Sequence, residues 1–92
     1  MRRVRVIVSG RVQGVSFRAA TAAEAKKLGV VGFAKNRSDG CVEIEAEGPK
    51  DRVTELLLWC EQGPPAARVT RFAVEELTPL GPGASERSFE AR

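Results

Sequence analysis

The chain opens with an alternation of hydrophobic and polar residues. Over residues 3–9 valine recurs at every second position, and this period of two predicts a half-buried strand. Residues 18–28 are rich in helix formers, and Gly29 ends the predicted helix as a C-cap. Helical spacing puts Arg18 on the same side as the residues expected to face inward, which are Thr21, Ala22, Ala25 and Leu28.

Two segments in the middle of the chain predict a hairpin. VVGFAKN at 30–36 and CVEIEAEG at 41–48 flank RSDG, so an Asp-Gly turn is expected to join two strands. In the second of these strands the apolar side chains would face the core. Glu43, Glu45 and Glu47 would then face water.

The second half of the chain predicts another helix and further strands. An amphipathic helix begins at Gly48-Pro49 and ends at Gly63-Pro64-Pro65. Its apolar stripe repeats at i, i+3, i+4 and i+7, as Val53, Leu56, Leu57 and Cys60. Residues 68–76 alternate around Phe72 and Val74 as a strand. After a Pro/Gly-rich loop, the final SFEAR segment predicts a short edge strand.

The predicted order of elements is therefore β-α-β-β-α-β. With right-handed crossovers, this order gives an α+β, ferredoxin-like sandwich, an antiparallel sheet with two helices on one face. A short C-terminal strand would extend the sheet edge. The length of 92 residues suits one domain, residues 1–92. Because this fold hosts enzymes, RNA-binding domains and regulatory modules, it does not determine the function.

Composition and charge indicate where the protein is located and whether it contacts a membrane. Hydrophobic residues make up 42% and charged residues 29%, as in ordinary soluble proteins. The apolar runs are far shorter than the ~20 residues of a membrane span or the core of a signal peptide. We therefore expect a cytoplasmic monomer without membrane contact. The net charge is +3, and Arg2, Arg3 and Arg5 form either an anion-attracting face or a solvated edge.

Several reactive residue types are absent or sparse. The chain has no His and no Tyr, which removes the commonest general base near neutral pH. Cys41 and Cys60 form no CxxC motif, so neither a zinc nor an iron–sulfur site is expected. Two small buried hydrophobic residues are a simpler interpretation of these cysteines than a disulfide. The sequence thus indicates a site that uses no metal and no cofactor.

The stretch SGRVQGVSFR joins the first predicted strand to the first helix. Gly10 and Gly14 bracket the turn and allow successive N–H groups to form an anion-binding nest. The helix N-terminus adds further N–H groups and the positive end of its dipole. Arg18 lies at the mouth of this helix. Its guanidinium suits either a bound phosphate or an internal carboxylate, and the sequence leaves both open.

Asn36 is the only asparagine in the chain and ends the second predicted strand. Asparagine is common before turns, so a turn-forming role is one interpretation. Hydrogen bonding to a substrate or to water is the other.

Two motifs in these regions resemble those of a known family. GRVQGVSFR at 10–18 and GFAKNRSDGCVE at 32–43 are similar to the two signature motifs of acylphosphatases, in the same order and at the expected separation. The later segments AEGP and QGPPAARV are also typical of that family. The resemblance extends from about residue 4 to 92.

The resemblance implies an activity and a role for particular residues. Acylphosphatases hydrolyse the carboxyl–phosphate bond of small acyl phosphates to a carboxylate and inorganic phosphate, without metal. Arg18 would grip the phosphoryl oxygens, and Asn36 would orient the attacking water. The backbone of the loop would cradle the phosphoryl group, through Gln13, Gly14, Val15, Ser16, Phe17 and Arg18. The chain departs from the family pattern where Ser16 replaces a common glycine, Ala19 a common aromatic residue and Phe33 a tryptophan.

The implied chemistry agrees with a site that lacks histidine. A carboxylate is a good leaving group and needs no general acid, so phosphoryl transfer requires mainly positioning and charge stabilisation. Two other functions remain open from the sequence: a non-catalytic domain of the same lineage that binds phosphate or carbamoyl phosphate, and an RNA-binding module. RNA binding is disfavoured because the chain is poor in aromatic residues and the predicted third strand presents glutamates outward. We therefore expect no nucleic-acid partner.

Overall fold

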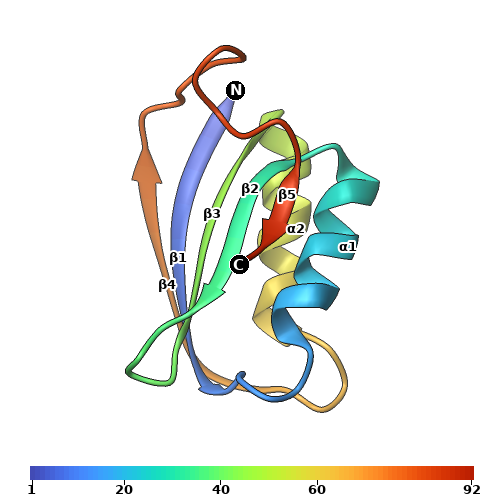
Figure 1. Cartoon of the computed structure of the whole chain (residues 1–92), viewed down its shortest axis with the longest axis vertical. Coiled ribbons are helices and arrows are strands. Elements are labelled where there is room, and N and C mark those ends of the chain that lie inside the picture. Colours follow the sequence, from blue (N-terminus) through green and yellow to red (C-terminus); the bar gives the residue numbers. More distant parts are fainter.

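The computed structural model describes residues 1–92 and contains five strands and two helices. Both helices lie against the same face of the sheet, as Figure 1 shows. This arrangement confirms the ferredoxin-like α+β fold. In chain order the elements are β1 (Arg2–Arg11), α1 (Phe17–Leu28), β2 (Val31–Asn36), β3 (Val42–Gly48), α2 (Lys50–Gln62), β4 (Arg68–Leu77) and β5 (Phe89–Ala91).

The strands are ordered β4-β1-β3-β2-β5 across the sheet. The predicted C-terminal edge strand is present, but it changes the character of the sheet. β5 pairs in parallel with β2, with Gly32 opposite Phe89 and Ala34 opposite Ala91. The sheet is therefore mixed, and the prediction of an antiparallel sheet is wrong at this edge. The chain crosses from β4 at one edge to β5 at the other, and it arrives there running in the direction of β2 (Figure 1).

The core lies between the sheet and the helices. The alternation predicted for β1 is confirmed, because Val4, Val6 and Val8 are all 0% exposed. Fully burying one such side chain contributes about 1.5–3 kcal/mol to folding. The residues predicted to face inward from α1 are buried, except that Leu28 at the helix end is half-buried and packs against the core.

The opposite face of the sheet differs from the expectation of a hydrated glutamate row. Glu47 is 1% exposed, so the prediction that it faces water is wrong. Residues 78–88 fold back over this end of β3, and the main-chain N–H groups of Leu80 and Gly81 donate to its carboxylate at 2.8 and 3.1 Å. Arg3 lies 3.3 Å from the same carboxylate. These contacts compensate the loss of water around the buried charge.

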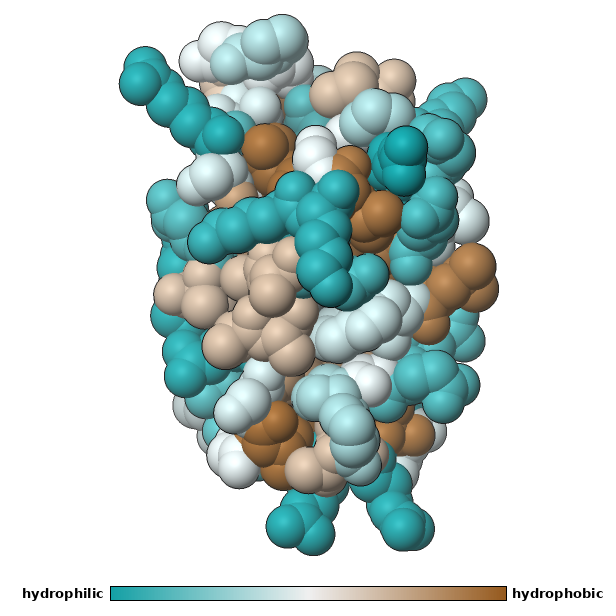
Figure 2. Space-filling view, turned by 90° about the vertical axis from the view of Figure 1, so that its right-hand side faces the viewer, coloured by the Kyte–Doolittle hydropathy of each residue, from teal (hydrophilic) through white to brown (hydrophobic).

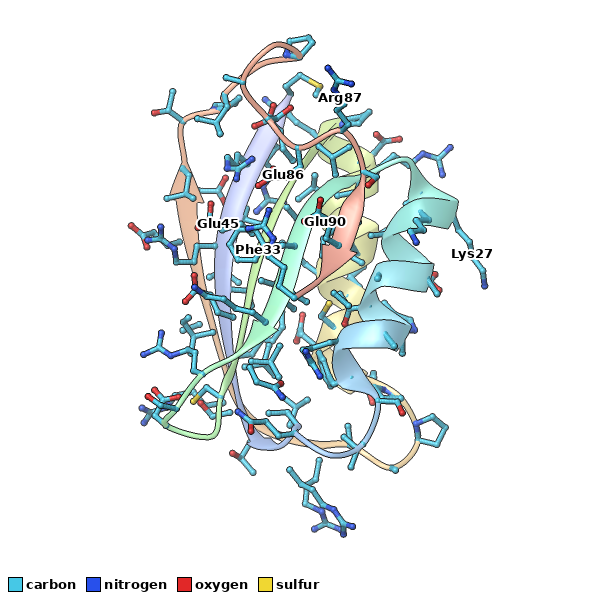
Figure 3. The ribbon with its side chains drawn as sticks, in the orientation of Figure 1. Lys27, Phe33, Glu45, Glu86, Arg87 and Glu90 are labelled. Atoms are coloured by element: carbon cyan, nitrogen blue, oxygen red, sulfur yellow. The ribbon has the colours of Figure 1, made fainter.

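The arginines at the start of the chain are neutralised by carboxylates of neighbouring strands. Arg2 contacts Glu76 at 2.6 Å, and Arg3 and Arg5 contact Glu45 at 2.9 and 3.2 Å. Arg3 is itself buried. These three residues therefore form neither an anion-attracting face nor a solvated edge. Arg3 and Arg5 belong to an ion-pair network on the face of the sheet away from the helices (Figure 3). Arg2 lies on the opposite face, where its guanidinium also donates a hydrogen bond to α2.

Glu86 ties the 78–88 loop to this network, since its carboxylate lies 3.2 Å from Arg3. Burial is the largest single effect and favours the neutral acid. The hydrogen bond from Arg3, a main-chain hydrogen bond and the positive charges of Arg3 and Arg92 together outweigh burial and lower the pKa of Glu86. The lowered pKa makes the ionised residue stabilising above its unfolded pKa of about 4.3, and this stabilisation is lost as the pH falls through the folded value.

Replacing Glu86 with glutamine is expected to lower the free energy of unfolding at pH 7 by about 1–2 kcal/mol. As the pH falls below about 4, the difference from the unmodified protein is expected to shrink progressively, because Glu86 becomes protonated and then is neutral like glutamine. Urea titrations between pH 3 and 7 measure the difference. Glu75→Gln is the control, because Glu75 is largely exposed and its pair with Arg5 is a surface contact. A difference that stayed constant with pH would contradict the assignment.

The two cysteines are free thiols, as expected, but the prediction that both are buried is wrong for Cys41, which is half-buried. Cys60 is buried between the helices and the sheet, and burial raises its pKa to about 12. The Sγ atom of Cys41 lies 3.3 Å from Ser9 Oγ. Neither α1 nor α2 combines the length and the hydropathy needed to cross a bilayer.

Candidate active site

The two motif regions meet at one end of the molecule. The loop between β1 and α1 and the turn between β2 and β3 both lie at the lower end in Figure 1, toward which β5 also runs. A cavity of about 510 Å³ opens at this end. Its walls bring Arg18 and Asn36 into one site, together with Val12, Gly14, Ser16, Phe17, Ala19 and Ala91.

The backbone of the 13–18 loop alternates in handedness. Gly14 and Ser16 have φ values of +75° and +61°, whereas the residues between and beside them have negative φ. Alternation of this kind makes a concave nest of N–H groups. No N–H group from Gln13 to Ala19 donates a hydrogen bond within the protein. The loop therefore offers a continuous run of free main-chain donors beside the cavity.

Helix α1 contributes the last of these donors. It begins at Phe17, and its first main-chain hydrogen bond runs from the N–H of Ala20 to the carbonyl of Ser16 at 3.0 Å. Because the preceding N–H groups have no partner and the dipole is positive here, this end favours an anion. Phe17 fixes the helix start in the core. It is 1% exposed, and its ring lies 6.1 Å from that of Trp59.

Gly10 lies outside this nest. The expectation that it brackets the turn is wrong, because β1 continues through Gly10 to Arg11. A β-bulge interrupts the register with β4 between Ser9 and Gly10. Gly10 has φ +117°, and a Cβ atom there would lie 2.1 Å from the carbonyl oxygen of Arg68. The residue is therefore glycine because the backbone of β4 approaches it closely.

Ser16 is the only residue other than glycine with positive φ. Its side chain makes no capping hydrogen bond, so nothing from the hydroxyl offsets the strained backbone. Ser16→Gly is expected to raise the free energy of unfolding by up to about 1 kcal/mol, after the added flexibility of the unfolded chain is subtracted. Ser16→Ala keeps the strain and is expected to give no such gain. Thermal unfolding of both variants tests this, and equal stability of the two would contradict it.

Arg18 is half-buried at the cavity wall and contacts no Asp or Glu side chain. The interpretation that it pairs with an internal carboxylate is therefore wrong. One nitrogen, Nη1, donates a hydrogen bond to the main-chain oxygen of Arg92. Arg92 is itself held by its N–H, which donates to Ala34 at 2.7 Å, and by its guanidinium, 4.3 Å above the ring of Phe33. The end of β5 thus orients Arg18 and leaves its other N–H groups available.

Asn36 is the last residue of β2, and its exposed side chain makes no hydrogen bond within the protein. The turn after it is closed by other groups and is longer than a two-residue Asp-Gly turn. The N–H of Arg37 donates to the carbonyl of Cys41 at 2.8 Å, and the N–H of Cys41 donates to Asp39 at 3.0 Å. This bond from Cys41 lowers the pKa of Asp39. The Asn36 amide is therefore free to bind a ligand.

Two of the predicted loop residues lie outside the cavity wall. Val15 packs against the core, and Gln13 points its side chain toward the β2–β3 turn. The amide contacts of Gln13 were missed by sequence reasoning, which considered only its backbone. Nothing in the motif distinguishes a main-chain role from a side-chain role. Ala91 was missed for another reason, since β5 reaches the site only through its pairing with β2.

The cavity wall contains no carboxylate, imidazole or thiol. The positive charge at the site comes from Arg18, and the remaining polar groups are main-chain N–H groups, the Ser16 hydroxyl and the Asn36 amide. Elsewhere in the protein no group of three or more His, Cys, Asp or Glu residues is gathered to hold a metal ion. Chemically, this is a site that can bind a compact anion and hydrogen-bond a neighbouring water.

Comparison with known proteins gives a consistent result. The family model for acylphosphatase matches residues 4–90. An acylphosphatase of Methylococcus capsulatus is 51% identical over 81 residues, which cover 88% of each chain. An acylphosphatase of Rubrobacter xylanophilus is 53% identical over 91 residues, covering 99% of this chain and 80% of the relative.

Solved structures agree with the sequence matches. The crystal structure of acylphosphatase from Bacillus subtilis superposes with a TM-score of 0.92 at 39% identity, covering 100% of this chain and 99% of that one. The similarity thus includes both motif regions and β5. The chain belongs to the acylphosphatase family.

Proposed function

We propose that the cavity hydrolyses acyl phosphates by direct attack of water on the phosphorus atom, with Arg18 and the 13–18 loop holding the phosphoryl group and Asn36 orienting the water. The unpaired N–H groups from Gln13 to Ala19, beside Arg18 and Asn36 in one cavity, are the observation that supports this assignment. Family membership supports the activity, and the geometry supports the division of roles.

The phosphoryl group is held by donors in fixed positions. The main-chain N–H groups of the nest meet the phosphoryl oxygens, and the guanidinium of Arg18 adds a charged donor fork. Because these donors are already oriented, they stabilise the charge that develops in the transition state without reorganisation. The hydrogen bond from Arg18 to the main-chain oxygen of Arg92 limits the rotation of the guanidinium before substrate binds.

The reaction breaks the bond between phosphorus and the acyl oxygen. The oxygen of water forms a new bond to phosphorus, and the carboxylate leaves with the electron pair of the broken bond. The side-chain oxygen of Asn36 accepts a hydrogen bond from the water and aligns it opposite the leaving group. An amide does not take up the proton at neutral pH, so the proton leaves with the phosphate product or passes to solvent.

Hydrolysis of acetyl phosphate in ¹⁸O-labelled water with EDTA present tests this proposal. The label is expected in inorganic phosphate and not in acetate, because water attacks phosphorus. The rate is expected to be unchanged by EDTA, because the cavity wall presents no carboxylate, imidazole or thiol to bind a metal. Label in acetate would refute attack at phosphorus, and loss of turnover restored by Mg²⁺ would refute the metal-free mechanism. No phosphate release at all would favour a non-catalytic phosphate-binding domain.

We further propose that residues 1–92 act as one domain, as a monomer in the cytoplasm and without a nucleic-acid partner. Ferredoxin-like RNA-binding domains stack bases on exposed aromatic residues of the sheet. Phe33, on that face, is 7% exposed and lies beneath Arg92 and Lys35.

The strongly hydrophobic residues on the side seen in Figure 2 form small separate areas, which favours a monomer. Light scattering and an RNA gel shift test these two expectations.

A further inference from the structure

The site is built from two segments, the 13–18 loop and the β2–β3 turn that follows Asn36. Gln13 makes the only hydrogen bonds between these two segments. No main-chain hydrogen bond joins the 13–18 loop to the β2–β3 turn, because the β1–β3 ladder ends at the pair Val8–Val42. The side-chain nitrogen of Gln13, Nε2, spans this gap. It lies 2.8 Å from the carbonyl oxygen of Arg37 and 2.9 Å from that of Cys41.

The chemistry of these contacts requires an amide. Both partners are main-chain carbonyls, which only accept hydrogen bonds, and a primary amide nitrogen has two hydrogens to donate. The two carbonyls stand at the two ends of the turn. The N–H of Arg37 also donates to the carbonyl of Cys41, so Gln13 joins a turn that is already closed. A carboxylate at position 13 would instead place its oxygens against two carbonyl oxygens.

Gln13 connects two parts of the site because of its position in the sequence. On one side Gln13 precedes Gly14, whose backbone lines the cavity and leads into Arg18. On the other side its amide binds the carbonyl of Arg37, the residue directly after Asn36. One side chain therefore adds a direct link between the loop that would hold the phosphoryl group and the strand end that would hold the water.

We propose that Gln13 is a positioning residue for the reaction, and that its side-chain amide keeps Asn36 aligned with the 13–18 loop. This inference rests on the role given to Asn36 above. Gln13 is half-buried, so its hydrogen bonds compete with water and stabilise the fold only modestly. Their effect on the rate is larger, because displacing a reacting group by about 1 Å costs on the order of a hundredfold.

A double-mutant cycle with Asn36→Ala tests the proposal. Gln13→Met keeps the length of the side chain and removes both donors. It is expected to lower kcat about 10–100-fold and to leave the phosphate inhibition constant within about threefold, because the nest itself is intact. On the Asn36→Ala background the same substitution is expected to lower kcat by less than about threefold, since the group that it positions is gone.

Gln13→Glu gives a second measurement that a general structural role would not affect. Its carboxyl can donate one of the two hydrogen bonds only when protonated. The ratio of its kcat to that of the unmodified protein is therefore expected to rise as the pH is lowered from 7.5 to 4.5. Gln62→Glu is the matched control, because Gln62 is the only other glutamine, is exposed at the end of α2 and does not line the cavity. Its kcat is expected to stay constant relative to the unmodified protein.

The outcomes separate this inference from the proposed function. An equal loss of kcat for Gln13→Met on both backgrounds, an unchanged kcat, or a parallel loss of phosphate binding would overturn the positioning role while the role of Asn36 stands. If Asn36→Ala alone left kcat unchanged, the role of Asn36 in the proposed mechanism would fail, and the positioning role of Gln13 would fail with it. Should Gln13→Met not fold, the pH dependence of Gln13→Glu decides, and a ratio that did not vary with pH would overturn the inference.

Discussion

Arg18→Ala is expected to lower kcat/KM for a simple acyl phosphate by about a thousandfold or more, the range seen when a preorganised cationic donor is removed from a phosphoryl-transfer site. Arg18 contacts the phosphoryl group both before and during the reaction in the proposed mechanism. The substitution is therefore expected to weaken inhibition by inorganic phosphate as well as to slow the chemical step. Steady-state kinetics with phosphate as a competitive inhibitor measure both effects.

Arg18→Lys separates the charge from the shape of the donor. Lysine keeps the positive charge but lacks the planar fork, so we expect only partial recovery of kcat/KM. Arg52→Ala is the control for net charge, because Arg52 lies on α2 and pairs at the surface with Glu55. Arg18→Ala also removes the contact with the main-chain oxygen of Arg92 and is expected to cost about 1 kcal/mol of stability. Unchanged phosphate inhibition in a folded Arg18→Ala protein would contradict the assignment.

The fold was predictable where the information is local. The valine alternation over residues 3–9 determined the buried face of β1, and the apolar spacing in α2 determined the face that covers it. The mixed sheet could not be predicted in the same way. β5 has only three residues, and its direction depends on the path of the long loop before it.

The burial of Glu47 illustrates the same limit on the other face of the sheet. Alternation placed Glu47 correctly on the side away from the helices. Whether that side meets water depends on the 78–88 loop, whose N–H groups reach the carboxylate from a distant part of the chain. A period of two therefore predicts the side on which a residue lies, but not what covers that side.

At the site, the sequence motifs predicted which residues take part, but the contacts of these residues became known only from the structure. The expectation of an anion-binding loop before α1 agrees with the free N–H groups found there. The turn-forming interpretation of Asn36 was open from the sequence, because asparagine before Arg-Ser-Asp-Gly suits both roles. The hydrogen bonds of Asp39 and Arg37 close the turn without the Asn36 side chain, and no sequence pattern indicates this.

Asn36→Ala is accordingly expected to lower kcat by about a hundredfold to a thousandfold, the cost of losing one oriented hydrogen-bonding group in a transition state. The phosphate inhibition constant is expected to remain within about twofold, because the water meets Asn36 only as the transition state forms. Stability is expected to change little, since the Asn36 side chain makes no hydrogen bond within the protein. A turn-forming role requires the opposite, a loss of about 1 kcal/mol with turnover retained.

Asp39→Ala provides the matched comparison within the same turn. Asp39 accepts the hydrogen bond from the N–H of Cys41, so its removal is expected to lower the melting temperature. Its side chain is absent from the cavity wall, and kcat is therefore expected to be retained. Comparison of the two variants thus tests whether Asp39 contributes to stability while Asn36 contributes to turnover. A less stable but fully active Asn36→Ala protein would show that the asparagine only forms the turn, and water would then need another partner in the site.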